Sequence, residues 1–229
     1  MHVGHGIPTV YKMKEGNTIS QLETINVEKD LGVWISKDMK PTEQCIQAAK
    51  KAQSVLGMVN RHFKDIDKED FGIIYKTYIR PHLEYCVQAW SPQMQKDKDC
   101  LEKIQRRATR MVKGLRKLPY QKRLKELGLY SLERRRLRGD MIETFKILTG
   151  KENINPGDFF TPADTSGGLR GHRLTLFKPR NYTTVRRNFF SSRVVNEWNR
   201  LPQVVVEAPS VNTFKNRLDK YWKDMGVYS

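Results

Sequence analysis

The pattern of apolar and polar positions changes character near residue 36. Before that point, the stretches 7–13 and 18–25 flank a Glu15-Gly16-Asn17 turn, which predicts a β-hairpin. A compact apolar run over 31–35 then predicts a further strand with a glycine near its start. We therefore expect a small β element over residues 1–36.

From Pro41 onward the apolar residues recur three or four positions apart, which predicts helices. The face of the first helix that we expect to be buried comprises Cys45, Ala49, Ala52, Leu56, Val59 and Phe63. A second helix, capped by Asp67, should end or kink before Pro81. Its expected inward positions are Phe71, Ile74, Tyr75 and Tyr78. A short helical piece over 82–90 follows.

Three further helices are predicted over 96–113, 119–127 and 131–149, each followed closely by a glycine suited to a C-terminal cap. Residues 151–171 then combine Asn, Pro, Ser and Gly without any period, which favours a linker or long exposed loop. Beyond it, 172–177 could form a short strand, and 189–199 and 210–222 have helical spacing. The expected fold class is mainly α, with an N-terminal β-hairpin element, a helical bundle over 37–150 and a small mixed α/β module over 172–229.

Positive charge is concentrated in two stretches of the chain. The protein has 229 residues and a formal net charge of +17. Residues 103–138 hold fourteen Lys or Arg against two acids, and residues 170–200 hold eight against one. Charge gathered in this way indicates a polyanion-binding protein rather than a general solubility coat.

The basic residues of the helix predicted over 96–113 share the face opposite its apolar stripe. They are Lys103, Arg106, Arg107, Arg110 and Lys113. This geometry suits contact with a phosphate backbone, and the alternative is a solvated face balanced by nearby acids. Further basic residues begin the helix over 131–149: Arg134, Arg135, Arg136 and Arg138. They could extend the phosphate-binding region or serve as a nuclear import signal.

Aromatic residues at helical spacing could stack on bases, although such residues more often belong to a core. They are Tyr75, Tyr78, Tyr85 and Trp90. No stretch is apolar enough to span a membrane, and no signal-peptide pattern begins the chain. The three cysteines, at wide spacings, predict neither a zinc ribbon nor a disulfide framework and fit a reducing compartment. We expect an intracellular protein, nuclear or cytoplasmic.

The sequence offers no catalytic or metal centre that we can assemble. Its Asp-x-Asp pairs, Asp65/Asp67 and Asp97/Asp99, lie at predicted helix starts, where capping explains them. Two-metal phosphoryl transfer needs carboxylates that converge on ions about 4 Å apart. There is also no nucleophile elbow and no Gly-rich phosphate loop. We expect no cofactor, no bound metal and no small-molecule substrate.

Several segments together resemble one known family. They are YIRPHLEYC at 78–86, AWSP at 89–92, LEKIQRRATR at 101–110, FFSSRVVNEWNRLP at 189–202 and FKNRL at 214–218. They are similar to the region downstream of the palm in LINE-type (non-LTR) retrotransposon reverse transcriptases, with the jockey-like and chicken-repeat-like elements the most similar. The resemblance covers nearly the whole chain.

The resemblance implies a role for each part of the chain. The stretch 30–35, including Leu31, Gly32, Val33 and Trp34, would be the primer grip, and 37–150 a thumb that holds the template–primer duplex. In the family, the catalytic Tyr/Phe-Ala-Asp-Asp motif and its Mg²⁺ belong to a palm upstream of Met1. Met1 would then be an internal methionine of a longer polyprotein. We therefore expect no polymerase activity from this chain alone.

The expected function is that of a truncated C-terminal part of an RNA-directed DNA polymerase. Its residual activity would be sequence-tolerant binding of duplex DNA, RNA or an RNA–DNA hybrid, without membrane partners. Two alternatives remain open from the sequence. One is a domesticated adaptor that binds acidic proteins through the same helices, and the other is a relic with no selected activity.

Overall fold

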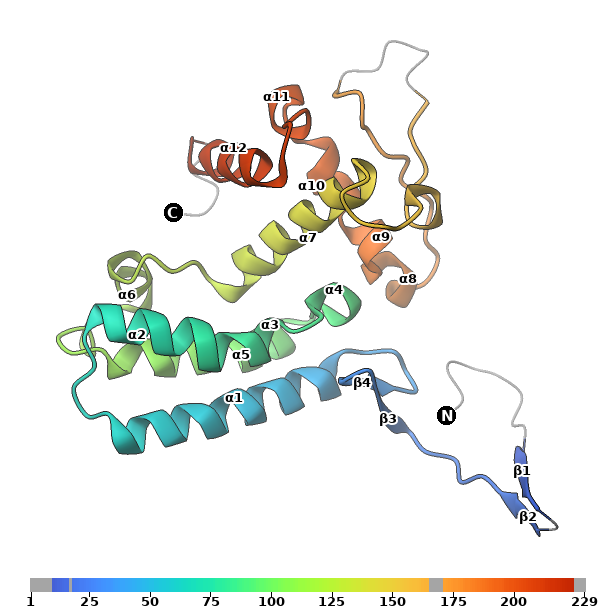
Figure 1. The fold of residues 1–229 in the computed structure, drawn as a ribbon, viewed down its shortest axis with the longest axis horizontal. Coiled ribbons are helices and arrows are strands. Elements are labelled where there is room, and N and C mark those ends of the chain that lie inside the picture. Colours follow the sequence, from blue (N-terminus) through green and yellow to red (C-terminus); the bar gives the residue numbers. More distant parts are fainter. Residues whose placement is uncertain (1–9, 17, 165–170, 225–229) are drawn as a thin grey trace. The chain divides into compact units, whose positions relative to one another are not determined.

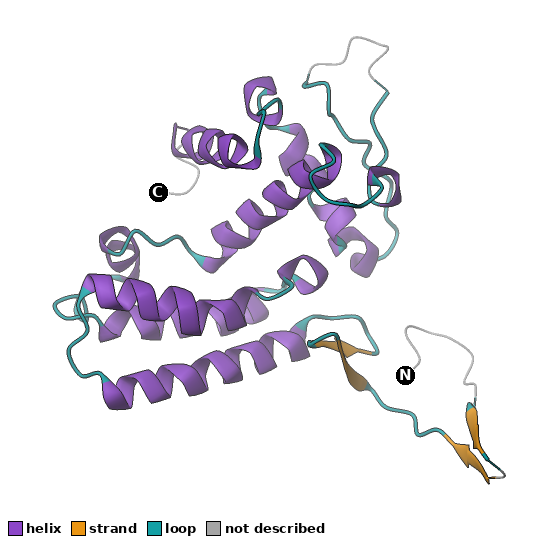
Figure 2. Cartoon of the chain, in the orientation of Figure 1, coloured by secondary structure: helices purple, strands orange, loops and turns teal. Residues whose placement is uncertain are grey.

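The computed structural model describes residues 10–16, 18–164 and 171–224. The chain divides into two compact units, Met1–Leu129 and Tyr130–Ser229. Helices dominate both units, and the described strands all lie near the N-terminus (Figures 1 and 2). The mainly α fold with an N-terminal β element is therefore confirmed, and each unit is described by itself below.

Two antiparallel hairpins form the β element. The first pairs β1 (Lys12–Glu15) with β2 (Thr18–Gln21), and all of its residues are exposed. A hairpin is present here as predicted, but β1 includes Glu15, which was expected in the turn, and residues 7–9 of the predicted stretch 7–13 lie outside the described residues. The second pairs β3 (Val27–Asp30) with β4 (Val33–Ser36). The apolar run over 31–35 was expected to be strand throughout, but its first two residues form the turn between β3 and β4 instead.

The first helix follows its sequence pattern closely. Helix α1 (Thr42–His62) packs against β4 and against α5 (Gln95–Ala108). Five of its six predicted inward positions are buried. Phe63 is the exception, because the helix ends at His62 and the Phe63 side chain is about half exposed.

The second helix contains a wider turn that the sequence did not predict. Asp67 caps α2 (Lys68–Ile74) by accepting hydrogen bonds from the Glu69 and Asp70 amides at 2.9 and 2.8 Å. The chain then makes a π-helical turn over 75–79 and continues directly into α3 (Arg80–Glu84), so it passes Pro81 without ending. The π turn also shifts the inward face by one position: Ile79 is buried, and Tyr78, which was predicted to be inward, is exposed.

Helix α5 ends earlier than predicted. It stops at Ala108 and continues as a 3₁₀ turn over 109–111, after which Val112 pairs with Ile66 in an isolated parallel bridge. The Lys113 amide donates to the Ile66 carbonyl at 2.9 Å. The remaining helices of this unit are α4 (Val87–Trp90) and α6 (Tyr120–Glu126).

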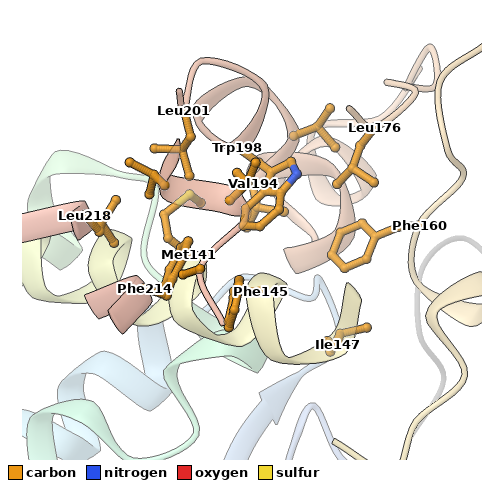
Figure 3. Close-up of a cluster of buried hydrophobic side chains, with 14 of the residues drawn as sticks. Met141, Phe145, Ile147, Phe160, Leu176, Val194, Trp198, Leu201, Phe214 and Leu218 are labelled. Carbon is orange, nitrogen blue, oxygen red and sulfur yellow. The ribbon is translucent and has the colours of Figure 1, made fainter. Parts of the chain in front are cut away.

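The second unit is built around α7 (Leu132–Leu148). Helices α10 (Val195–Asn199) and α12 (Val211–Asp224) pack against it. Phe145 of α7 stacks on Phe214 of α12 with ring centroids 4.3 Å apart, beside the buried Trp198 (Figure 3). The predicted domain boundary at residue 150 is therefore wrong, because α7 shares its core with the C-terminal helices.

The segment over 151–171 is not a free linker in its described part, residues 151–164 and 171. It contains a 3₁₀ turn at 156–158, and Phe160 belongs to the hydrophobic core. The following stretch, expected to be a strand, forms only an isolated bridge between Pro162 and Leu176. The unit's other helices are α8 (Thr184–Asn188), α9 (Phe190–Arg193) and α11 (Gln203–Val206). Its described residues thus form a helical module, not the mixed α/β module that we predicted.

Candidate nucleic-acid interface

Five basic side chains form an exposed surface along α5 and the turn that follows it. This basic ridge comprises Lys103, Arg106, Arg107, Arg110 and Lys113, and each of them is exposed. On the opposite side of the helix, Leu101, Ile104 and Ala108 are buried. The sequence predicted this division correctly, although Lys113 lies beyond the helix and is positioned by its bond to Ile66.

The basic ridge has no acidic partner within the part of the chain that the structure describes. None of its five side chains forms an ion pair with any residue that the structure describes. Glu126, the acid nearest in sequence on its C-terminal side, is paired with Lys68 instead, at 2.5 Å. Arg106 contacts a ring, with its guanidinium 5.0 Å from the Tyr120 ring centroid. The ridge therefore presents uncompensated positive charge to solvent.

A chain of polar side chains beneath the ridge holds α5 in place. The Tyr75 hydroxyl donates to the Gln105 side-chain oxygen, and the Gln105 amide donates to the Tyr120 hydroxyl at 2.8 Å. The Tyr120 hydroxyl in turn donates to the Glu102 carboxylate. Burial raises the pKa of each tyrosine hydroxyl, Tyr75 and Tyr120, well above the ordinary tyrosine range. Both hydroxyls therefore stay protonated and can donate hydrogen bonds. The network joins α5 to the π turn and to α6.

One arginine of the basic stretch has a structural role instead. Arg123 is buried and donates to the Thr109 hydroxyl at 3.0 Å, to the Leu118 carbonyl at 2.6 Å and to the Arg106 carbonyl at 3.3 Å. Its pKa is lowered, first by burial and then by Arg110 nearby. Arg123 thus ties the end of α5 to α6 and is not available to a ligand.

Four exposed cations that we did not assign to the site continue the positive surface of this unit. They are Arg116, Lys117, Lys122 and Lys125, on the loop after the ridge and on α6. None forms an ion pair among the described residues. These four residues contribute to the positive charge of residues 103–138. Helical periodicity could not predict that they belong to the same surface as the ridge, because they lie outside the helix that carries it.

The arginines at the start of α7 do not form the exposed extension that we predicted. Arg134 and Arg136 are buried, and Arg135 is half-buried. The Arg134 guanidinium lies 3.9 Å from the Tyr130 ring centroid, and Arg138 forms a two-point ion pair with Asp219 at 2.7 and 2.8 Å. Within the C-terminal unit, Arg134 is thus in contact with Tyr130, and Arg138 is neutralised by Asp219.

The residues that the resemblance assigned to a primer grip form the tip and one strand of the second hairpin. Val33 is buried, and the Trp34 amide donates to the Gln44 side chain at 2.9 Å. Gly32 lies against Tyr85, where an added Cβ would come within 3.2 Å of the ring. The Tyr85 hydroxyl also donates to the Leu31 carbonyl at 3.1 Å. Tyr85 thus contacts both residues of the turn, whereas the Leu31 side chain is 86 % exposed to solvent.

Most of the remaining candidates have core or structural roles, whereas Tyr78 is exposed and has neither role among the described residues. Tyr75 and Trp90 are buried, whereas Tyr78 and Tyr85 are exposed. Asp67 caps α2, and Asp97 is buried and accepts a hydrogen bond from Thr42 at 3.0 Å. Among the described residues no three His, Cys, Asp or Glu side chains are grouped so as to hold a metal ion.

No described helix combines the length and the apolar character needed to cross a bilayer.

Comparison with known proteins gives no further assignment. No family model matches the chain, and neither the curated proteins nor the solved structures contain a significant match.

Proposed function

We propose that this protein binds nucleic acid without sequence preference through the basic ridge on α5. The supporting observation is that five exposed cations on α5 and directly after it have no acidic partner among the described residues. Cations in such an arrangement can neutralise successive phosphates and release their counterions. On the family resemblance, the ligand is a template–primer duplex, and the chain derives from the C-terminal part of a retrotransposon reverse transcriptase, comprising the primer grip, the thumb and the C-terminal region.

Like charges three and four residues apart destabilise a helix, which favours a ligand-binding role over a solvated face. The buried network of Tyr75, Gln105 and Tyr120 supports this role, because it fixes the helix that carries the ridge. Contacts with phosphates position a nucleic acid but do not specify its sequence. The proposed activity is accordingly sequence-tolerant.

Salt-dependent binding to a labelled duplex tests the proposal. Five phosphate contacts predict a log–log slope of about −4 to −5. The variant Arg106→Gln/Arg107→Gln/Arg110→Gln keeps helix propensity and the buried face, and should bind more weakly with a slope shallower by about two to three. The weakening should be equal on unrelated duplex sequences.

A charge-matched control separates the ridge from net charge. Lys50→Gln/Lys51→Gln/Arg61→Gln removes three exposed cations from α1 of the same unit. It should leave the slope nearly unchanged. If both triple variants weaken binding equally, or if the ridge variant keeps wild-type affinity with an unchanged circular dichroism spectrum, the ridge is a solvated face and the proposal fails.

A further inference from the structure

The C-terminal unit carries a second exposed basic stretch, and this one also displays aromatic rings. We call residues 177–189 the aromatic–basic segment. Its aromatic side chains are Phe177, Tyr182 and Phe189, which are 55 %, 87 % and 45 % exposed. Large exposed rings this close together in sequence are uncommon on a surface with no ligand to cover them.

The cations of the aromatic–basic segment are exposed as well. They are Lys178, Arg180, Arg186 and Arg187. None forms an ion pair among the described residues, and the sequence from 173 to 196 contains no Asp or Glu.

Several acids of this unit pair with other arginines. Asp140 accepts two hydrogen bonds from Arg193, at 3.0 and 2.9 Å, and Asp219 is engaged by Arg138. The charges of Arg138 and Arg193 are thus neutralised by acids, whereas those of the aromatic–basic segment have no acidic partner among the described residues.

Both ends of the segment are fixed to the folded unit. Immediately before it, the Asn199 side chain accepts from the Leu176 amide at 2.9 Å and donates to the Leu176 carbonyl at 2.8 Å. At its end, the Arg186 guanidinium lies 5.6 Å from the Phe189 ring centroid, and the next residue, Phe190, is buried in the core. The exposed rings and cations are thus carried on an anchored loop and the short helix α8.

Cations interleaved with exposed rings match the chemistry of a single-stranded nucleic acid. The strand offers phosphates for the cations and unpaired base faces on which rings can stack, whereas a duplex hides those faces within its own stack. An acidic peptide would use the cations but would leave the rings without a role.

We propose that the aromatic–basic segment is a binding site for single-stranded nucleic acid, separate from the basic ridge. Tyr182 stacks on a base, and the four cations contact the flanking phosphates. The site extends the proposed function, but it uses different residues in the other compact unit, so either site can be wrong without the other.

Fluorescence anisotropy on the full-length chain tests this site with two probes. One is an oligothymidine of about twelve nucleotides, and the other is an abasic strand with the same number of phosphates. Tyr182→Ala should weaken binding of oligothymidine by about tenfold, as expected for losing one stacked base, and leave the abasic strand unaffected. Arg186→Gln/Arg187→Gln should weaken binding of both strands.

Two comparisons make the outcome decisive. Lys220→Gln/Lys223→Gln, which removes two exposed cations of α12, should change neither affinity. The ridge variant should lose duplex binding while it keeps the preference for oligothymidine over the abasic strand. The proposal is overturned if Tyr182→Ala binds oligothymidine as the wild type does, or if a twelve-residue polyglutamate peptide competes as well as oligothymidine. In either case the duplex result for the ridge still stands by itself.

Discussion

Leu31 adopts a backbone conformation that leucine rarely occupies. Its φ is +45°, and Gly32 after it has φ +84°, so both turn residues have the positive values that a two-residue type I′ hairpin requires. Glycine meets this requirement without strain, whereas a leucine in the left-handed region costs on the order of 1–3 kcal/mol. With its side chain 86 % exposed, Leu31 recovers little of that cost by burial.

Replacing this leucine should stabilise the hairpin. Leu31→Asn supplies the residue that type I′ turns favour before glycine, and should stabilise the closed hairpin by about 0.5–1 kcal/mol. Amide hydrogen exchange in β3 and β4 should then slow by about two- to fivefold. Leu31→Val, which is β-branched, should accelerate exchange instead, and slower exchange in the valine variant would contradict the strain argument.

Residue-level predictions succeeded where one long helix keeps a regular α-helical pitch. The buried face of α1 was predicted correctly at Cys45, Ala49 and Leu56, because apolar residues spaced three or four apart stay on one face of a regular helix. The prediction was wrong at Tyr78, because the π turn adds a residue and moves burial to Ile79. Hydrophobic periodicity assumes a constant helical pitch, so it cannot detect such a change.

At the scale of elements, a predicted strand fails when no neighbouring strand is present to pair with it. The stretch 172–177 was expected to be a strand, yet Leu176 satisfies both of its backbone groups with the Asn199 side chain. His172 is buried with its Nε2 atom 3.0 Å from the Trp198 carbonyl. The backbone of Leu176 is therefore hydrogen-bonded by a side chain and not by a neighbouring strand of a sheet. A sequence pattern does not reveal which residue supplies these hydrogen bonds.

Helix α7 belongs to the C-terminal unit, because its buried side chains are part of that unit's core. Met141 and Phe145 are completely buried in the core that also holds Trp198 and Phe214. A fragment of residues 130–229 should therefore fold, whereas a fragment of residues 151–229 lacks that part of the core. Each large apolar side chain removed from a core costs about 2–5 kcal/mol, which a module of this size cannot sustain.

Thermal unfolding of the two fragments, followed by near-ultraviolet circular dichroism, measures the difference. The longer fragment should melt cooperatively, and the shorter one should show no transition. A cooperative transition of similar midpoint in both fragments would contradict this assignment. It would favour the domain boundary at residue 150 that the sequence pattern predicted.

At the scale of the whole molecule, the sequence predicted how much positive charge there is better than where it is exposed. The stretch 103–138 crosses the boundary between the two units after Leu129. On its N-terminal side the ridge is exposed as predicted, but Arg123 is buried there, and beyond the boundary Arg138 is neutralised by Asp219. Charge counts do not distinguish these cases, because burial and pairing depend on contacts between residues distant in sequence.

The unpaired charges of the ridge have a consequence for the protein when no ligand is bound. Side chains of one sign at this spacing repel one another in the folded helix and repel less in an extended chain. Raising sodium chloride from about 50 to about 500 mM screens that repulsion. The melting temperature of the N-terminal unit should therefore rise with salt, although the same salt weakens nucleic-acid binding. In the triple glutamine variant the melting temperature should start higher and respond less, and an unchanged salt response would show that repulsion at the ridge does not limit stability.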